Sequence, residues 1–78
     1  MDHKLKEYAE RIAIDYNKSV KERIDRLLEL DCTNYTLLGI DSSNEERQST
    51  KDSSRYIYNK INEIDSNEGK LLLKTLDL

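Results

Sequence analysis

The sequence contains no proline, phenylalanine or tryptophan, and it has only two glycines, one cysteine and one histidine. Because the glycines are Gly39 and Gly69, helix-breaking residues fall at just two places in the 78 residues. A lone Cys32 cannot form an internal disulfide, and one cysteine with one histidine cannot supply a zinc cluster. We therefore expect a helical chain without a disulfide, a metal or a cofactor.

Long apolar runs are also missing. No pure apolar run is longer than three residues, as in Leu71–Leu73, whereas a membrane-spanning helix needs about 20 apolar residues. Residues 1–16 are charged throughout and lack the apolar centre of a signal peptide. These absences predict a cytoplasmic protein that does not enter a membrane.

An excess of positive charge is absent as well. The 16 acids outnumber the 13 bases, the net charge is −3, and the two signs alternate along the chain. No basic block exists to follow a phosphate backbone, so the sequence argues against general nucleic-acid binding.

The hydrophobic content is low for a chain that folds alone, at 36% against 37% charged residues. A domain of this size buries only about 60% of its unfolded surface. We expect one helical domain over residues 1–78 whose marginal core is completed by self-association into a homo-oligomer, or by a partner.

The first thirty residues carry a regular apolar pattern. Steps of three and four residues connect Leu5, Tyr8, Ala9, Ile12, Ala13, Tyr16, Val20, Ile24, Leu27 and Leu28. This spacing predicts one amphipathic helix over residues 3–30.

Residues 31–42 interrupt this pattern with β-branched residues, asparagine and glycine. The segment is nevertheless rich in apolar side chains: Cys32, Tyr35, Leu37, Leu38 and Ile40. Because loops are usually polar, we expect it to fold back over the open end of a helix pair, with Cys32 buried.

A second helix is predicted over residues 43–65. Ser42 and Ser43 each have a glutamate three residues later, so either serine can form a capping box. Ser66 is a candidate N-cap for a short helix over 67–77, although a frayed tail is the alternative. The predicted fold is therefore all-α: a long antiparallel helical hairpin with an apolar connecting loop and a short C-terminal helix, assembling into an oligomeric helix bundle.

The first half of this second helix, residues 44–55, has no apolar side chain. Helical spacing places five polar or cationic residues in one stripe, and their hydrogen-bond donors suit an anion or an acidic protein surface. Tyr35 can add a second stacking face for a nucleobase beside Tyr58. An ordinary solvated helix face is the alternative. The stripe consists of Arg47, Thr50, Lys51, Ser54 and Tyr58.

The sequence offers little for catalysis. The single histidine, His3, lies at the N-terminal end, and no glycine-rich phosphate loop is present. We expect a non-enzymatic protein. On the outer side of the first helix, Ile14 is an apolar residue among charged ones, and it is a candidate contact for another chain.

Two functions remain in view. The first is a small helical interaction protein, most simply an inhibitor or antagonist that binds a partner protein. The alternative is an oligomeric sponge that sequesters an anionic small molecule such as a nucleotide messenger. The lysine-, asparagine-, serine- and isoleucine-rich composition is common among phage and mobile-element proteins.

Overall fold

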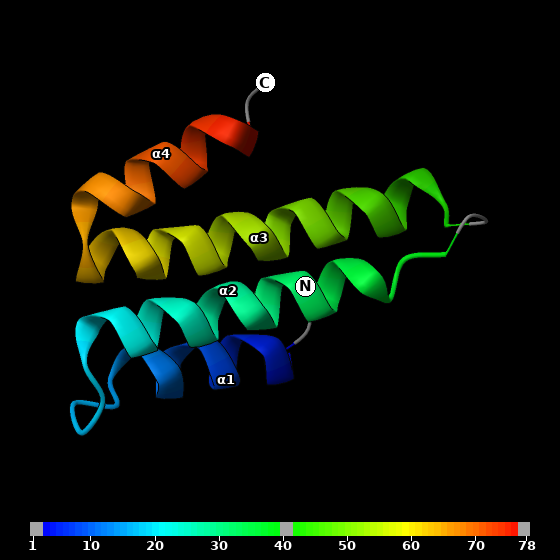
Figure 1. The fold of residues 1–78 in the computed structure, drawn as a ribbon. Coiled ribbons are helices and arrows are strands. Elements are labelled where there is room, and N and C mark those ends of the chain that lie inside the picture. Colours follow the sequence, from blue (N-terminus) through cyan, green and yellow to red (C-terminus); the bar gives the residue numbers. More distant parts are fainter. Residues whose placement is uncertain (1–2, 40–41, 77–78) are drawn as a thin grey trace.

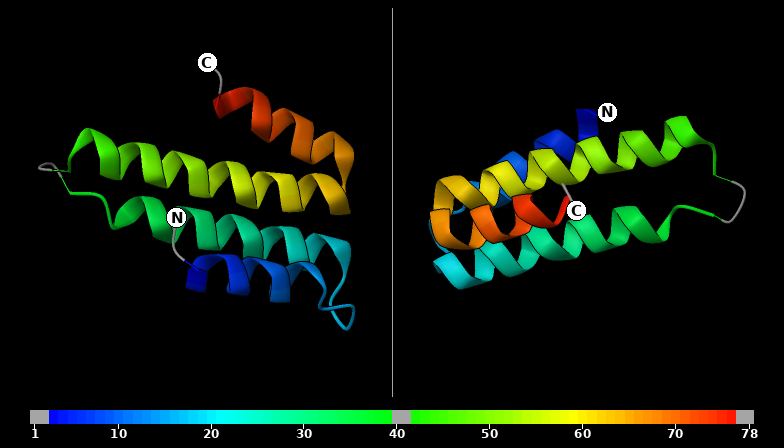
Figure 2. Two further views of the ribbon diagram at one scale, coloured as in Figure 1. Left: turned by 180° about the vertical axis from the view of Figure 1, so that it is seen from behind. Right: turned by 90° about the horizontal axis from the view of Figure 1, so that it is seen from above.

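The computed structural model describes residues 3–39 and 42–76, which are all-α and contain no strand. Helices α2 and α3 run antiparallel beside each other, α1 packs against both of them, and α4 packs against α3 (Figures 1 and 2). The pair α2–α3 extends beyond α1 and α4 at one end (Figure 1). The helices are α1 (His3–Ala13), α2 (Val20–Thr36), α3 (Asn44–Ile64) and α4 (Ser66–Leu76).

The prediction of one continuous helix over residues 3–30 is wrong, because residues 14–19 separate α1 from α2. This segment contains aspartate, asparagine and serine, which are weak helix formers. Ser19 is the N-cap of α2, and its hydroxyl accepts a hydrogen bond of 3.1 Å from the backbone nitrogen of Glu22. Arg23 Nη1 donates a 2.8 Å hydrogen bond to the carbonyl oxygen of Ala13, the last residue of α1.

The break lets α1 fold back, so that Leu5 and Ala9 join the core built from α2 and α3. Leu27, Ile57 and Ile61 are the largest apolar side chains that are completely buried. A straight helix of about 40 Å would leave its N-terminal half without a neighbouring helix to cover its apolar face. Folding back is therefore favoured by burial of that face.

The predicted connection over residues 31–42 is also corrected, since α2 continues to Thr36. Cys32 and Tyr35 therefore lie on a helix and are exposed, and Leu37 has 79% of its side chain accessible to solvent. The segment does not bury these residues over the end of a helix pair. Leu38 is half-buried, and Ile40 lies outside the described residues.

Helix α3 begins where the capping signal predicted. Ser43 is its N-cap and accepts a 3.1 Å hydrogen bond from the backbone nitrogen of Glu46. In its polar first half, the hydroxyls of Thr50 and Ser53 donate to backbone carbonyl oxygens one turn earlier. Both side chains are buried, because they are small and their hydrogen bonds are satisfied within the helix.

Asp65 alone joins α3 to α4. It is the C-cap of α3, and its side chain accepts hydrogen bonds from the backbone nitrogens of Asn67 and Glu68, at 3.1 and 3.4 Å. Asp65, rather than the predicted Ser66, thus caps the N-terminus of α4. The C-terminal segment is helical through Leu76, which is buried in the core.

Gly69 permits the close approach of α4 to α3. A Cβ atom at this position would lie 2.3 Å from the Cα atom of Asn62 in α3. No side chain fits in that space, so the contact requires glycine.

Replacing Gly69 with alanine should lower the free energy of unfolding by about 1–3 kcal/mol, since α4 has to move away from α3. The greater helix propensity of alanine acts in the opposite direction, by about 1 kcal/mol. Urea unfolding followed by circular dichroism measures the sign, with Lys70→Ala at the exposed neighbouring position as the control. A Gly69→Ala protein that is more stable than wild type would contradict the close approach.

Candidate functional site

One end of the bundle carries both the α1–α2 loop, residues 14–19, and the α3–α4 turn at Asp65 (Figures 1 and 2). We call it the loop end. Three apolar side chains from seven consecutive residues are exposed here: Ile14 by 61%, Tyr16 by 79% and Val20 by 44%. Two clefts open beside them, with volumes of about 490 and 520 Å³. The loop end therefore combines exposed apolar groups with concave surface.

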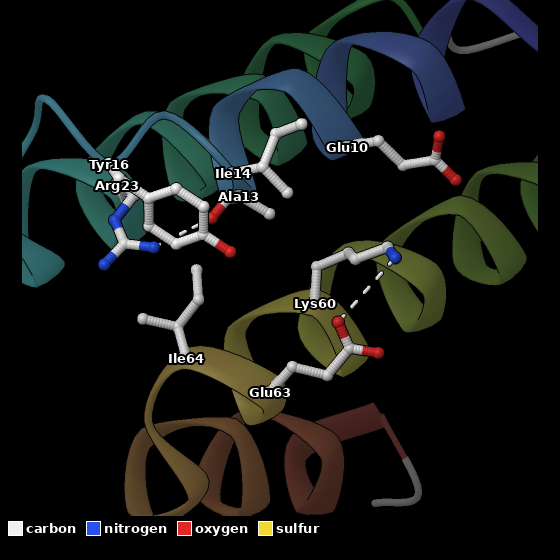
Figure 3. A pocket seen from close by; sticks show the side chains of 8 residues that line it. All are labelled: Glu10, Ala13, Ile14, Tyr16, Arg23, Lys60, Glu63 and Ile64. Carbon is white, nitrogen blue, oxygen red and sulfur yellow. Dashed lines mark hydrogen bonds and ion pairs between the residues drawn. The ribbon is translucent and has the colours of Figure 1, made fainter.

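The first cleft, which we call the Arg23 cleft, lies between α1, the start of α2 and the end of α3 (Figure 3). Ile14 and Ile64 lie on opposite sides of the opening, and the ring of Tyr16 lies beside the guanidinium of Arg23 (Figure 3). The guanidinium carbon is 5.2 Å from the centre of the Tyr16 ring. The lining residues are Glu10, Ala13, Ile14, Tyr16, Arg23, Lys60, Glu63 and Ile64.

The acidic side chains of the Arg23 cleft already have partners. Glu10 accepts a 2.7 Å hydrogen bond from the hydroxyl of Tyr56, and Glu63 lies 3.7 Å from the amine of Lys60. Burial, followed by the hydrogen bond to Glu10, raises the pKa of Tyr56 to about 12. The Tyr56 hydroxyl thus stays protonated and connects α3 to α1 at neutral pH.

The second cleft lies between α2 and the α3–α4 turn. Its apolar wall is formed by Val20, Ile24 and Leu28, which lie on one side of α2. Asp65 and Glu68 form the opposite, acidic rim. This cleft continues the apolar surface of the loop end onto α2.

Only part of the predicted stripe of Arg47, Thr50, Lys51, Ser54 and Tyr58 is exposed to solvent. Thr50, Ser54 and Tyr58 are buried between α2 and α3. Arg47 is exposed, and its Nε donates a 3.4 Å hydrogen bond to the carbonyl oxygen of Ser42. Lys51 is half-buried. The structure therefore does not bring these five residues together as an open row of donors.

Asp31 accepts hydrogen bonds from two residues of that stripe. The Ser54 hydroxyl donates to Asp31 Oδ1, and the Tyr58 hydroxyl donates to Asp31 Oδ2 at 2.6 Å. Each carboxylate oxygen thus accepts one buried hydroxyl, and the charge is compensated inside the helix pair. Sequence reasoning missed Asp31 because it assigned that residue to a loop. The signal was its helical spacing after Ile24 and Leu27.

The other predicted contact residues lie elsewhere. Ile14 belongs to the loop end. Arg47 lies in the first turn of α3, whereas it is the last turn of α3 that reaches the loop end. Tyr35, near the C-terminus of α2, is 42% exposed. The seven predicted residues are thus distributed over the buried α2–α3 contact, the first half of α3, the C-terminal part of α2 and the loop end.

Within the part of the chain that the structure describes, no group of three or more His, Cys, Asp or Glu side chains is arranged to hold a metal ion. The same residues contain no helix of the length and apolar character that crossing a membrane requires. No family model, no curated protein and no solved structure matches this chain.

Replacing Tyr58 with phenylalanine should destabilise the protein by about 1–3 kcal/mol at neutral pH, because one oxygen of Asp31 loses its buried donor. Burial, and then the hydrogen bond to Asp31, raise the pKa of Tyr58 above its usual 10.0. The stabilisation from its protonated hydroxyl is complete below that pH, and it is lost as the pH rises through the folded-state pKa.

Wild type should therefore lose more stability than Tyr58→Phe between pH 10 and pH 12, the range that starts at the usual tyrosine pKa. Urea unfolding at several pH values measures this difference. Tyr16→Phe is the matched control, since the hydroxyl of the exposed Tyr16 forms no hydrogen bond with any of the described residues. Parallel pH profiles for wild type and Tyr58→Phe would rule out the proposed hydrogen bond.

Proposed function

We propose that this chain is a non-enzymatic interaction protein that binds a partner protein through the loop end and acts as an inhibitor or antagonist. The observation that carries the proposal is the exposure of Ile14, Tyr16 and Val20 beside two clefts. Aromatic and apolar groups next to concave surface are typical of the centre of a protein interface. Occupying a surface of the partner requires no catalytic group.

The size of the exposed surface supports an interaction role. The folded chain exposes 5662 Å², whereas a monomer of its 9.2 kDa mass is expected to expose about 4,900 Å². The difference is comparable to the roughly 800 Å² that each partner buries in an interface of standard size. We propose that it acts in the cytoplasm, because the single cysteine, Cys32, is exposed and unpaired.

The alternative, a sponge for an anionic nucleotide on the predicted stripe, gains no support from this geometry. The hydroxyls of Ser54 and Tyr58 already donate to Asp31, and the hydroxyl of Thr50 donates within its own helix. A phosphate at the stripe would have to displace these bonds next to a carboxylate, which opposes binding of an anion.

The experiment that tests partner binding uses two glutamate substitutions at exposed apolar positions. Ile14→Glu lies in the loop end, and Leu71→Glu, at a residue with the same 61% exposure on α4, is the matched control. The partner is captured from the native host with wild type and then titrated by calorimetry. We expect Ile14→Glu to weaken binding by about tenfold or more. Equal affinity of the two variants would overturn the proposal.

We also propose that a second copy of the chain covers a groove at the other end of α1. Tyr8 and Leu37 are exposed on this groove, which lies between α1 and the C-terminal part of α2 and has a volume of about 230 Å³. The assignment rests on the exposure of Tyr8 and Leu37 at the groove and leaves the loop end open for the partner.

Leu37→Glu should therefore shift a homo-oligomer to the monomer, because it places a charge in the contact between copies. Sedimentation velocity over a range of concentrations measures the assembly, with Leu71→Glu again as the control. A wild-type protein that is monomeric at every concentration and still unfolds cooperatively would eliminate the self-association proposal.

A further inference from the structure

Arg23 is a permanently charged side chain with unused hydrogen-bond donors. Its Nε is buried and has no hydrogen-bond partner, and Arg23 forms no ion pair with any of the described residues. Among the described residues, Nη1 alone has a hydrogen-bond acceptor, the carbonyl oxygen of Ala13. Nη2 is neither buried nor hydrogen-bonded to any of the described residues. Because a guanidinium stays charged, this site favours a ligand that supplies an acceptor to Nη2.

The surrounding residues fix the guanidinium in place. The hydrogen bond to Ala13 attaches it to the end of α1, and the ring of Tyr16 covers one of its faces (Figure 3). A planar group held in this way loses little conformational freedom on binding.

The chemistry of the cleft selects the kind of acceptor. Arg23 and Lys60 are balanced in formal charge by Glu10 and Glu63, so a doubly charged phosphate meets two carboxylates as well as two cations. A singly charged carboxylate matches the fork of the guanidinium with less repulsion. The volume of about 490 Å³ is within the range of small-ligand sites.

The walls of the cleft add a second requirement. Ala13, Ile14 and Ile64 present apolar surface beside Arg23. A ligand that joins an apolar side chain to a carboxylate would satisfy both features at once. The C-terminal residue of a polypeptide, when that residue is apolar, has this structure.

We propose that the Arg23 cleft binds a carboxylate of the partner protein that is carried next to an apolar side chain, as at an apolar C-terminus. This inference rests on the proposed function and names the chemistry that the loop end recognises. Arg23 donates to the carboxylate, and the apolar group lies between Ile14 and Ile64.

The first test uses three small probes in NMR titrations of the ¹⁵N-labelled protein. N-acetyl-leucine carries both features, N-acetyl-leucinamide lacks the carboxylate charge, and inorganic phosphate lacks the apolar group. We expect N-acetyl-leucine to shift the amide signals of Ile14, Tyr16, Arg23 and Ile64 with a dissociation constant about tenfold or more below that of the amide. Equal binding of acid and amide, tighter binding of phosphate, or no shift by any probe would overturn the inference.

The second test removes the donor. Arg23→Gln should abolish the preference for the acid over the amide, whereas Arg26→Gln, at an exposed position of the same helix, should retain it. Because Arg23→Gln also loses the hydrogen bond to Ala13, circular dichroism checks that each variant is folded. A folded Arg23→Gln protein with an unchanged preference for the acid would contradict the assignment.

These outcomes separate the inference from the function on which it rests. If Ile14→Glu loses the captured partner and Arg23→Gln does not, the loop end is the interface and the carboxylate assignment is wrong. If the acid binds through Arg23 while Ile14→Glu retains the partner fully, the cleft recognises a carboxylate and the partner-binding proposal is wrong.

Discussion

The hydrogen bond from Arg23 to the carbonyl oxygen of Ala13 connects the end of α1 to the first turn of α2. Together with the Ser19 cap, it makes residues 14–19 a defined turn, and α1 is thereby directed back onto the core. The burial of Leu5 and Ala9, the exposure of Tyr16 and the position of the Arg23 cleft all follow from that change of direction.

The polar first half of α3 shows a different way of packing two helices. Apolar side chains are replaced there by small hydroxyl residues, which satisfy their own hydrogen bonds or donate to Asp31. Such a contact contributes less hydrophobic energy than a leucine layer, but a buried carboxylate with two fixed donors tolerates few alternative alignments of α2 and α3.

The sequence predicted the helical class, the start of α3 at the Ser43 cap and the existence of a C-terminal helix, because those features depend on local signals. It failed at the break near residue 16, where the apolar spacing continues through Tyr16 and Val20 into α2. Ser19 and Glu22 have the same spacing as Ser43 and Glu46, so a local stop signal competed there with the periodic one.

Among the residues of the loop end, Ile14 could be identified from the sequence, because it is an apolar residue on a charged helix face. The role of Arg23 could not be predicted from the sequence, because its surroundings arise from the fold-back of α1 and from the end of α3, about forty residues further along the chain. Asp31 was missed for a related reason: a buried aspartate is recognised only when the hydroxyls that compensate it are known.

Because a single residue, Asp65, joins α3 to α4, the number of residues around this corner is constrained by the packing of α4 on α3. Successive residues of an α-helix are rotated by about 100° around its axis. An insertion or deletion of one residue in α4 between the corner and Gly69 would therefore turn the rest of that helix by that angle, moving Leu76 out of the core and removing Gly69 from its position against Asn62. Among variants of this protein, the number of residues between Asn62 and Gly69 should accordingly vary less than the identity of those residues.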